Sequence, residues 1–305
     1  MAAVAVALEK SRSYAEPDLD AKVARLLAAA WQPAKNAHIL VKPNLLLAQG
    51  LACPTPEIVA AVCKWLLDQG VKIKICDSPA FGTASHVANS IGLTTAIRPL
   101  GLKVTSFSGY RPLSVQLSDG KTVSVKVGLE ALECDQILSV ARVKAHSQMR
   151  ITLTTKNCYG CIGGYRKAIG HARFGNDVSC FSDFVAGLWQ ALPPVAGFID
   201  GIIAMDVTGP RNGKAFELGL IGASCSTAAL DNAILAALGL ASDNVPLAAA
   251  LKLRGVDEKP VYTHLKPEDF SVTGFQVPSK LKNISFSPFV LARSMWKRFW
   301  LSWKR

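Results

Sequence analysis

The chain has 305 residues, of which 50% are hydrophobic and 18% charged, with a formal net charge of +12. This composition supports a large folded core and excludes disorder as the main state. No apolar run reaches the length of a membrane span, and the apolar start meets charged residues at Glu9 and Lys10, unlike a secretory signal. The eight cysteines are scattered, which favours a reducing cytoplasmic location over an oxidising compartment.

Apolar, β-branched runs alternate with helix-like segments along the chain. This alternation is typical of an α/β fold with a mostly parallel sheet and helices on both faces. Thr55, Pro56 and Glu57 supply an N-cap, a proline at the first helical position and an early acidic residue, so a helix is expected to begin there. We predict strands at 1–10, 38–41, 71–76, 104–107, 136–140, 195–199 and 218–223, and helices at 55–67, 83–91 and 227–238.

Residues 113–117 and 122–127 alternate apolar and polar side chains around an Asp-Gly turn. This pattern predicts a β-hairpin, which we expect as an antiparallel addition at an edge of the sheet. We expect one α/β domain over 1–269, with two lobes meeting near 140–165 as the alternative arrangement. Residues 270–305 then form a basic C-terminal extension.

Polar side chains follow four of the predicted strands. Carboxyl ends of parallel strands share one edge of a sheet, so these side chains are expected to converge on a crevice there. The alternative is that polar residues follow strands because loops are polar. The residues are Lys42 and Asn44, Asp77, Arg142, Lys144 and His146, and Asp200.

The segment 144–164 is the richest in chemically versatile side chains. Lys144 and Lys156 could bind negative charge, while Thr155 and Asn157 could direct hydrogen bonds to a ligand. His146 could transfer protons near neutral pH, or it could be a core histidine bonded to a backbone carbonyl. We assign catalytic roles to His146, Lys156 and Asp200. Substrate-binding roles are assigned to Lys42, Asn44, Asp77, Lys144, Thr155 and Asn157.

Cys158 and Cys161 form a C-x-x-C pair, a spacing that suits a dithiol, a disulfide or two ligands of a soft metal. With His171 and Cys180 they make a candidate metal or iron–sulfur site, and the alternative is a pair of buried structural thiols. Ferredoxin-type cluster motifs are absent from the sequence. The nearby glycines lack the order of a P-loop or a dinucleotide fingerprint, so neither ATP nor NAD is indicated as a cofactor.

The end of the chain combines aromatic and basic residues. Seven Lys and Arg residues, and no Asp or Glu, follow Asp269. Residues 289–305 predict a basic amphipathic helix that binds a membrane surface, its own domain or a partner protein. Nucleic acid is not expected as a partner, because basic and aromatic residues are not interleaved through the body. The aromatic face comprises Ala292, Trp296, Phe299, Trp300 and Trp303.

The chain resembles the domain of unknown function 362 family over residues 39–231. The resemblance rests on ordered motifs that include Val41-Lys-Pro-Asn-Leu45, Val143-Lys-Ala-His146, Thr154-Thr-Lys-Asn157 and Thr208-Gly-Pro210. Many relatives carry a ferredoxin-like module, which this chain lacks. The family is also distantly similar to the lactate racemase group, a similarity that implies an α/β fold and an acidic small substrate.

We therefore expect an enzyme acting on an anionic small molecule. Participation of the C-x-x-C thiols would favour an oxidoreductase, and otherwise proton transfer or isomerisation is more natural. Two alternatives remain open. One is a metal or iron–sulfur electron-transfer protein. The other is a membrane-associated accessory protein that handles a cofactor or pigment intermediate, peripheral to the inner face of a membrane.

Overall fold

The computed structural model describes residues 3–80, 82–164, 166–256 and 258–283. Nine strands within these residues form one mixed sheet. Its strand order is β11-β1-β10-β9-β7-β2-β3-β4, and β8 pairs with β7. Strands β9, β7, β2, β3 and β4 run parallel, whereas β10 and β8 run antiparallel to their neighbours. The α/β class predicted from the sequence is confirmed. The strands are β1 (Ala3–Lys10), β2 (His38–Pro43), β3 (Lys72–Asp77), β4 (Val104–Ser106), β7 (Gln136–His146), β8 (Arg150–Thr152), β9 (Val195–Asp206), β10 (Lys214–Ser224) and β11 (Lys259–Tyr262).

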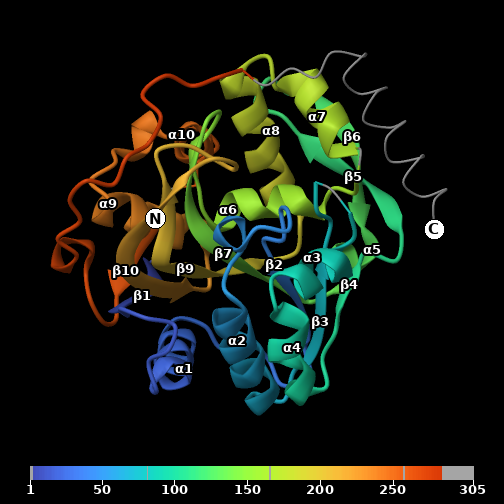
Figure 1. Cartoon of the computed structure of the whole chain (residues 1–305). Coiled ribbons are helices and arrows are strands. Elements are labelled where there is room, and N and C mark those ends of the chain that lie inside the picture. The colour runs from blue at the N-terminus through green and yellow to red at the C-terminus, as the bar shows by residue number, and fades with distance from the viewer. Residues whose placement is uncertain (1–2, 81, 165, 257, 284–305) are drawn as a thin grey trace.

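Helices cover both faces of this sheet. Figure 1 shows α1, α2 and α4 gathered on one side, with α6, α8 and α9 on the other. One apolar cluster lies on the α1 and α2 side and two lie on the other side, because side chains of successive strand residues point to opposite faces. The helices are α1 (Leu19–Ala30), α2 (Pro56–Asp68), α3 (Ala84–Ser90), α4 (Leu93–Ile97), α5 (Leu129–Glu133), α6 (Thr154–Asn157), α7 (Arg166–Phe174), α8 (Val178–Ala191), α9 (Thr227–Ala237) and α10 (Pro246–Leu253).

The predicted hairpin is present, as β5 (Tyr110–Gln116) and β6 (Thr122–Gly128), but it does not extend the main sheet. It forms a separate two-stranded sheet whose Val115, Val123 and Val127 join the core beneath α8. The prediction of an edge position was wrong. Alternation of side chains identifies a hairpin, but it does not say which surface the apolar face covers.

The four strands predicted to deliver polar side chains are neighbours in the sheet, in the order β9-β7-β2-β3. Strands β2 and β3 end close to the predicted positions, whereas β7 continues six residues further, to His146, so Arg142 and Lys144 lie inside it. Strand β9 continues to Asp206, so Asp200 lies inside the strand, opposite Arg142 of β7. The neighbouring parallel strands nevertheless bring these polar residues to one region of the sheet.

Helix α2 begins as predicted, with Pro56 in the first turn after Thr55 at the N-cap position. The hydroxyl group of Thr55 does not cap the helix. It donates instead to the Asp200 carboxylate at 2.6 Å, so the start of α2 is joined to β9. A local helix signal is therefore also part of a long-range polar network.

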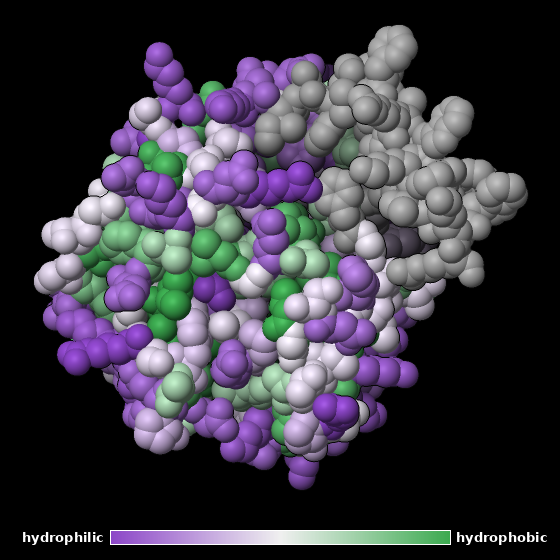
Figure 2. Space-filling model, in the orientation of Figure 1, coloured by the Kyte–Doolittle hydropathy of each residue, from purple (hydrophilic) through white to green (hydrophobic). Residues whose placement is uncertain are grey.

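Residues 270–283 run back over the body of the protein. Phe270 is buried, and the amides of Val207 and Lys282 pair with the carbonyls of Gln276 and Ser147, respectively. The predicted aromatic helix at 289–305 lies outside the described residues. No helix within the described residues combines the length and apolar character needed to cross a bilayer. On the face shown in Figure 2, hydrophobic side chains gather near the middle and hydrophilic ones occupy most of the margin.

Candidate functional site

A buried ion pair joins β2 and β3 at the carboxyl edge of the sheet. Lys42 Nζ lies 2.6 Å from Asp77 Oδ1, and both side chains are almost completely buried. Asp77 also accepts hydrogen bonds from the backbone amides of Leu45 and Ser78, each at 2.7 Å. The charge of Lys42 is thus balanced inside the protein, which suits a structural role for this pair.

Asn157 at the end of α6 ties this ion pair to the rest of the edge. Its side-chain oxygen accepts from Lys42 Nζ at 3.0 Å and from Asn44 Nδ2 at 3.1 Å. Its amide nitrogen donates to the Lys42 carbonyl at 2.9 Å and to Ser139 Oγ at 3.0 Å. Every polar atom of the Asn157 side chain has a hydrogen-bond partner. Asn157 therefore fixes β2, β7 and α6 relative to one another.

A second buried pair lies between β7 and β9. Arg142 Nη2 is 3.2 Å from Asp200 Oδ2, and Arg142 Nε donates to the Cys53 carbonyl at 2.6 Å. Asp200 also accepts from the Tyr14 hydroxyl at 2.8 Å and from the Thr55 amide and hydroxyl. Both Asp200 oxygens therefore have protein partners, and the structure gives this predicted catalytic residue the surroundings of a scaffold.

Lys144 and Lys156 differ from these paired cations. Lys144 donates to Asn44 Oδ1 and, at 2.6 Å, to the Ala52 carbonyl, but it forms no ion pair with a carboxylate in the described chain. Lys156 is partly buried, and within the described residues its amine forms no hydrogen bond or ion pair and lies over the ring of Tyr159. Desolvation by burial lowers the pKa of Lys144 to about 7 and that of Lys156 to about 8.

His146 lies two residues beyond Lys144 on the same strand. Its Nδ1 accepts hydrogen bonds from the backbone amides of Gln148 and Met149, at 3.1 and 3.2 Å. These contacts place the proton of the neutral ring on Nε2. Burial, together with the charges of Lys156, His171 and Lys144, holds the pKa of His146 well below its usual value. The ring is therefore a neutral hydrogen-bond donor at physiological pH.

We call Lys144, His146, Lys156 and His171 the basic cluster, because the charge of Lys156 lowers the pKa of each of the other three. The ring of Tyr159 joins two of them. Lys156 Nζ lies 6.0 Å from the centre of that ring, and the His171 ring centre lies 5.3 Å from it. Desolvation lowers the pKa of His171 to about 3, so this ring is also neutral.

Asp231 of α9 fixes the helix that carries Lys156. Its carboxylate accepts from the Thr154 and Thr155 amides, each at 2.9 Å, and from the Thr154 hydroxyl at 2.5 Å. Burial raises the pKa of Asp231 to about 6. The sequence singled out Thr155 as a substrate-binding residue, whereas the structure buries it completely and uses its amide to bind Asp231. Asp231 itself was missed as a site residue, because it lies within an apolar helix far along the chain.

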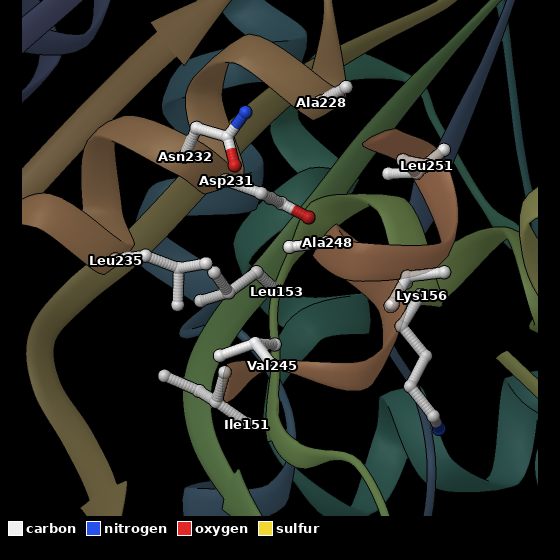
Figure 3. Close-up of a pocket in the computed structure, with 11 residues that line it drawn as sticks. Ile151, Leu153, Lys156, Ala228, Asp231, Asn232, Leu235, Val245, Ala248 and Leu251 are labelled. Carbon is white, nitrogen blue, oxygen red and sulfur yellow. The ribbon is translucent and has the colours of Figure 1, made fainter. Parts of the chain in front are cut away.

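A small pocket of about 20 Å³, room for one water molecule, lies beside α6, α9 and α10. The stem of Lys156 forms part of its wall. Its amine points away from the pocket and from the Asp231 carboxylate, as Figure 3 shows. The pocket is otherwise mainly apolar, lined by Ile151, Leu153, Ala228, Asp231, Asn232, Leu235, Val245, Leu247, Ala248 and Leu251.

The structure does not bring the four predicted metal ligands together. Cys158 and Cys161 are fully buried free thiols, while Cys180 is exposed. His171 stacks on the ring of Phe181 with a centre-to-centre distance of 4.4 Å. Within the described part of the chain, no three His, Cys, Asp or Glu side chains form a group that could hold a metal ion. Burial raises the pKa of both C-x-x-C thiols, which keeps them protonated and poorly reactive.

The glycine-rich stretch after Cys158 has a packing role at the Lys42–Asp77 pair. A Cβ atom on Gly160 would lie 2.4 Å from Lys42 Nζ and 3.0 Å from Asp77 Oδ1. Only a glycine lets the backbone approach the pair this closely. The glycine at position 160 is thus explained by steric fit.

The fold and this edge define an α/β protein in which parallel strands deliver buried polar networks and a cluster of basic side chains to one region. The chain belongs to the family described as Domain of unknown function (DUF362), whose model matches residues 39–236. The resemblance inferred from the sequence motifs is confirmed.

A curated relative shares 31% identity over 309 aligned residues, covering 97% of this chain and 94% of its own length. That relative is a thylakoid-associated protein of the cyanobacterium Synechocystis sp.. Among solved structures, the chain is similar to the lactate racemase apoprotein from Thermoanaerobacterium thermosaccharolyticum, with a TM-score of 0.49, 12% identity and coverage of 77% of this chain. It spans 57% of that racemase chain. A protein from Thermotoga maritima gives a TM-score of 0.43 at 10% identity, covering 68% of this chain and 55% of its own.

Proposed function

We propose that this protein is an enzyme acting on a small anionic molecule, which binds at the basic cluster. One observation carries the proposal: Lys144 and Lys156 have no carboxylate partner in the described chain, whereas the buried cations Lys42 and Arg142 do. A charge removed from water costs free energy unless another charge compensates it. An anionic ligand would supply the compensation that the protein does not.

The basic cluster has hydrogen-bond donors that could meet such a ligand. His146 offers Nε2–H, since Nδ1 is occupied by two backbone amides. Lys144 retains donor capacity beyond its two acceptors, because an ammonium group has three N–H bonds. A carboxylate or phosphate accepts several hydrogen bonds and matches this set of donors.

The surrounding residues position the lysines. Asn44 accepts from Lys144 through Oδ1 and donates to Asn157 through Nδ2, so its amide is used within the protein. Lys42, Asp77 and Asp200 likewise have partners. We therefore assign ligand contact to Lys144, His146 and Lys156, and place the other predicted site residues in the supporting scaffold.

Calorimetric titration at low ionic strength tests this proposal, with propionate, malonate and inorganic phosphate as probes. Replacing Lys156 by Gln removes one charge-assisted contact, so we expect binding to weaken roughly ten- to hundredfold. Lys72→Gln is the control, because Lys72 is exposed on β3 and its replacement by Gln removes the same formal charge. Absence of binding to any probe, or equal binding by both variants, would remove the proposal.

A second function, attachment to a membrane surface, is favoured by the relative that is described as thylakoid-associated and aligns with 97% of this chain. The sequence feature behind it is residues 289–305, which combine three tryptophans with basic residues and contain no Asp or Glu. Such a segment can place aromatic rings at headgroup depth and cations against anionic lipid. We propose that it docks the protein on an anionic membrane.

Flotation with lipid vesicles tests the membrane proposal. The full chain should float with vesicles that contain anionic lipid, and less with purely zwitterionic vesicles. A chain truncated after residue 288 should stay in the soluble fraction. Flotation that is unchanged by truncation would show that this segment is not the attachment site.

A further inference from the structure

We propose that Lys156 is a covalent nucleophile whose amine condenses with the carbonyl group of a small oxo acid, while Lys144 and His146 hold the carboxylate of that molecule. This inference rests on the proposed function and deepens it, since it names a class of substrate. The starting observation is that the Lys156 amine, unlike those of Lys42 and Lys144, has no hydrogen-bond acceptor among the described residues. No hydrogen bond to a described residue therefore requires the Lys156 amine to stay protonated, and its lone pair can attack a carbonyl group.

The attachment of Lys156 to the fold directs the amine. Helix α6 has only four residues, and Asp231 holds it through the amides of Thr154 and Thr155. The Asp231 carboxylate is thereby occupied, and the Lys156 amine points away from it (Figure 3). No nearby acid in the described chain thus stabilises the charged form of Lys156 at the expense of the free amine.

The surroundings of the Lys156 stem also favour this chemistry. Apolar side chains, including Leu153 and Leu251, line the pocket along the stem, and the aromatic ring of Tyr159 lies 6.0 Å from Nζ. Burial lowers the pKa of the amine to about 8, so a substantial fraction is unprotonated at physiological pH. Lysines in apolar or cationic surroundings are activated in this way for reaction with carbonyl groups.

Lys144 suits the second role better. Its amine donates to two oxygens, of Asn44 and Ala52, which fix the amine in place and leave one N–H bond of the ammonium form for a ligand. An arriving carboxylate would stabilise that ammonium form. His146 adds a neutral Nε2–H donor from the same strand. The cluster thus offers one amine able to react and two groups able to bind the acid.

The proposed step balances without an oxidant or a reductant. The free Lys156 amine attacks the carbonyl carbon, a C–N bond forms as the C=O π bond breaks, and one proton passes from the nitrogen to the oxygen to give a carbinolamine. Loss of that oxygen as water leaves an imine, whose nitrogen gains a proton to become the iminium. The iminium can then withdraw electrons from the adjacent carbon, which is the purpose of such an adduct in covalent catalysis.

Borohydride trapping tests the inference on the full chain. We expect pyruvate plus borohydride to give one stable adduct, which intact mass spectrometry detects and peptide mapping locates at Lys156. Propionate lacks a carbonyl group beyond its carboxylate and should give none. Lys156→Arg keeps the charge but has no reactive amine, so it should lose the adduct, whereas Lys72→Arg should keep it. A thermal melt of each variant checks that the fold is retained.

The outcomes separate this inference from the proposed function. An adduct at Lys156 that depends on pyruvate supports both. Propionate binding without any pyruvate adduct would overturn the covalent step and leave anion binding in place. Adducts located at Lys144, or spread over exposed lysines at equal yield, would also overturn it. Absence of both binding and adduct would remove the two proposals together.

Discussion

The carboxylate of Asp231 accepts two hydrogen bonds from Thr154, one from its amide at 2.9 Å and one from its hydroxyl at 2.5 Å. The two residues are 77 positions apart in the sequence. Their contact joins α9 to the start of α6, the short helix that presents Lys156 and Asn157. The position of the basic cluster therefore depends on a residue outside it.

Replacing Asp231 by Ala should destabilise the protein by roughly 1–3 kcal/mol, because buried amides would lose their acceptor. Chemical denaturation at pH 7 measures this loss. Asp243→Ala serves as a control, since Asp243 is exposed and pairs only with the exposed Lys252. Equal stability of the two variants would show that Asp231 does not fix α6.

The titration of Asp231 predicts a pH dependence of stability. Its pKa is about 6 in the folded protein against an ordinary value of 3.8, so the folded state binds the proton more tightly than the unfolded state does. Stability should consequently fall as pH rises from about 4 to about 6, and change no further from this group above that range. Asp231→Asn removes this titration. The unfolding free energy of the wild type minus that of Asp231→Asn should therefore decrease as pH rises over that interval. A constant difference would contradict the assignment.

Much of the polar edge of the sheet could be predicted from the sequence. Parallel strands end at a common edge, so the polar residues after 38–41, 71–76 and 136–140 could be placed together from the order of apolar runs alone. What the pattern could not show is which cation meets which anion. Lys42 and Lys144 both lie at or near strand ends, yet only Lys42 has an aspartate within reach.

The missed residues share a physical cause. Tyr14 bonds Asp200 across 186 positions, and Asp231 lies in a helix whose other residues are mostly apolar. In the sequence, Tyr14 cannot be distinguished from an ordinary loop residue, and Asp231 cannot be distinguished from an acidic residue on a helix surface. Asp200 was assigned a catalytic role on its apparent strand end, whereas β9 continues past it and surrounds it with donors. Long-range pairing decides such roles, and one sequence does not display it.

The Lys42–Asp77 pair leads to a prediction on stability. Lys42→Met leaves a buried carboxylate without its cation and should cost roughly 3–5 kcal/mol. Adding Asp77→Asn removes that charge while retaining an oxygen for the Leu45 amide, so the double variant should be more stable than Lys42→Met alone. Lys121→Met is the control, because the Lys121–Asp119 pair is exposed and should matter little. A double variant less stable than the single one would show that the charges are not coupled.

Gly160→Ala tests the close approach of the backbone to the same pair. The added methyl group would lie 2.4 Å from Lys42 Nζ, so the ion pair or the C-x-x-C turn must shift. We expect a loss of roughly 1–3 kcal/mol, as for overpacked cores. Gly50→Ala is a matched control, because no heavy atom lies within 4 Å of its added Cβ. Denaturation curves of the two variants that coincide would refute the steric explanation.

The two lysines of the basic cluster predict opposite pH trends for binding and for covalent reaction. Lys144 and Lys156 have pKa values of about 7 and about 8, so both carry charge below pH 7 and lose it as pH rises to about 9. Affinity for propionate should fall across that range, since an anion binds the protonated amines. Pyruvate trapping should rise instead, because only the free amine attacks a carbonyl. Lys156→Arg should flatten the fall in affinity, as arginine stays charged. Titrations and trapping yields measured from pH 6 to pH 9 on one preparation would show both trends, and parallel pH profiles for binding and trapping would contradict the assignment of the reactive amine.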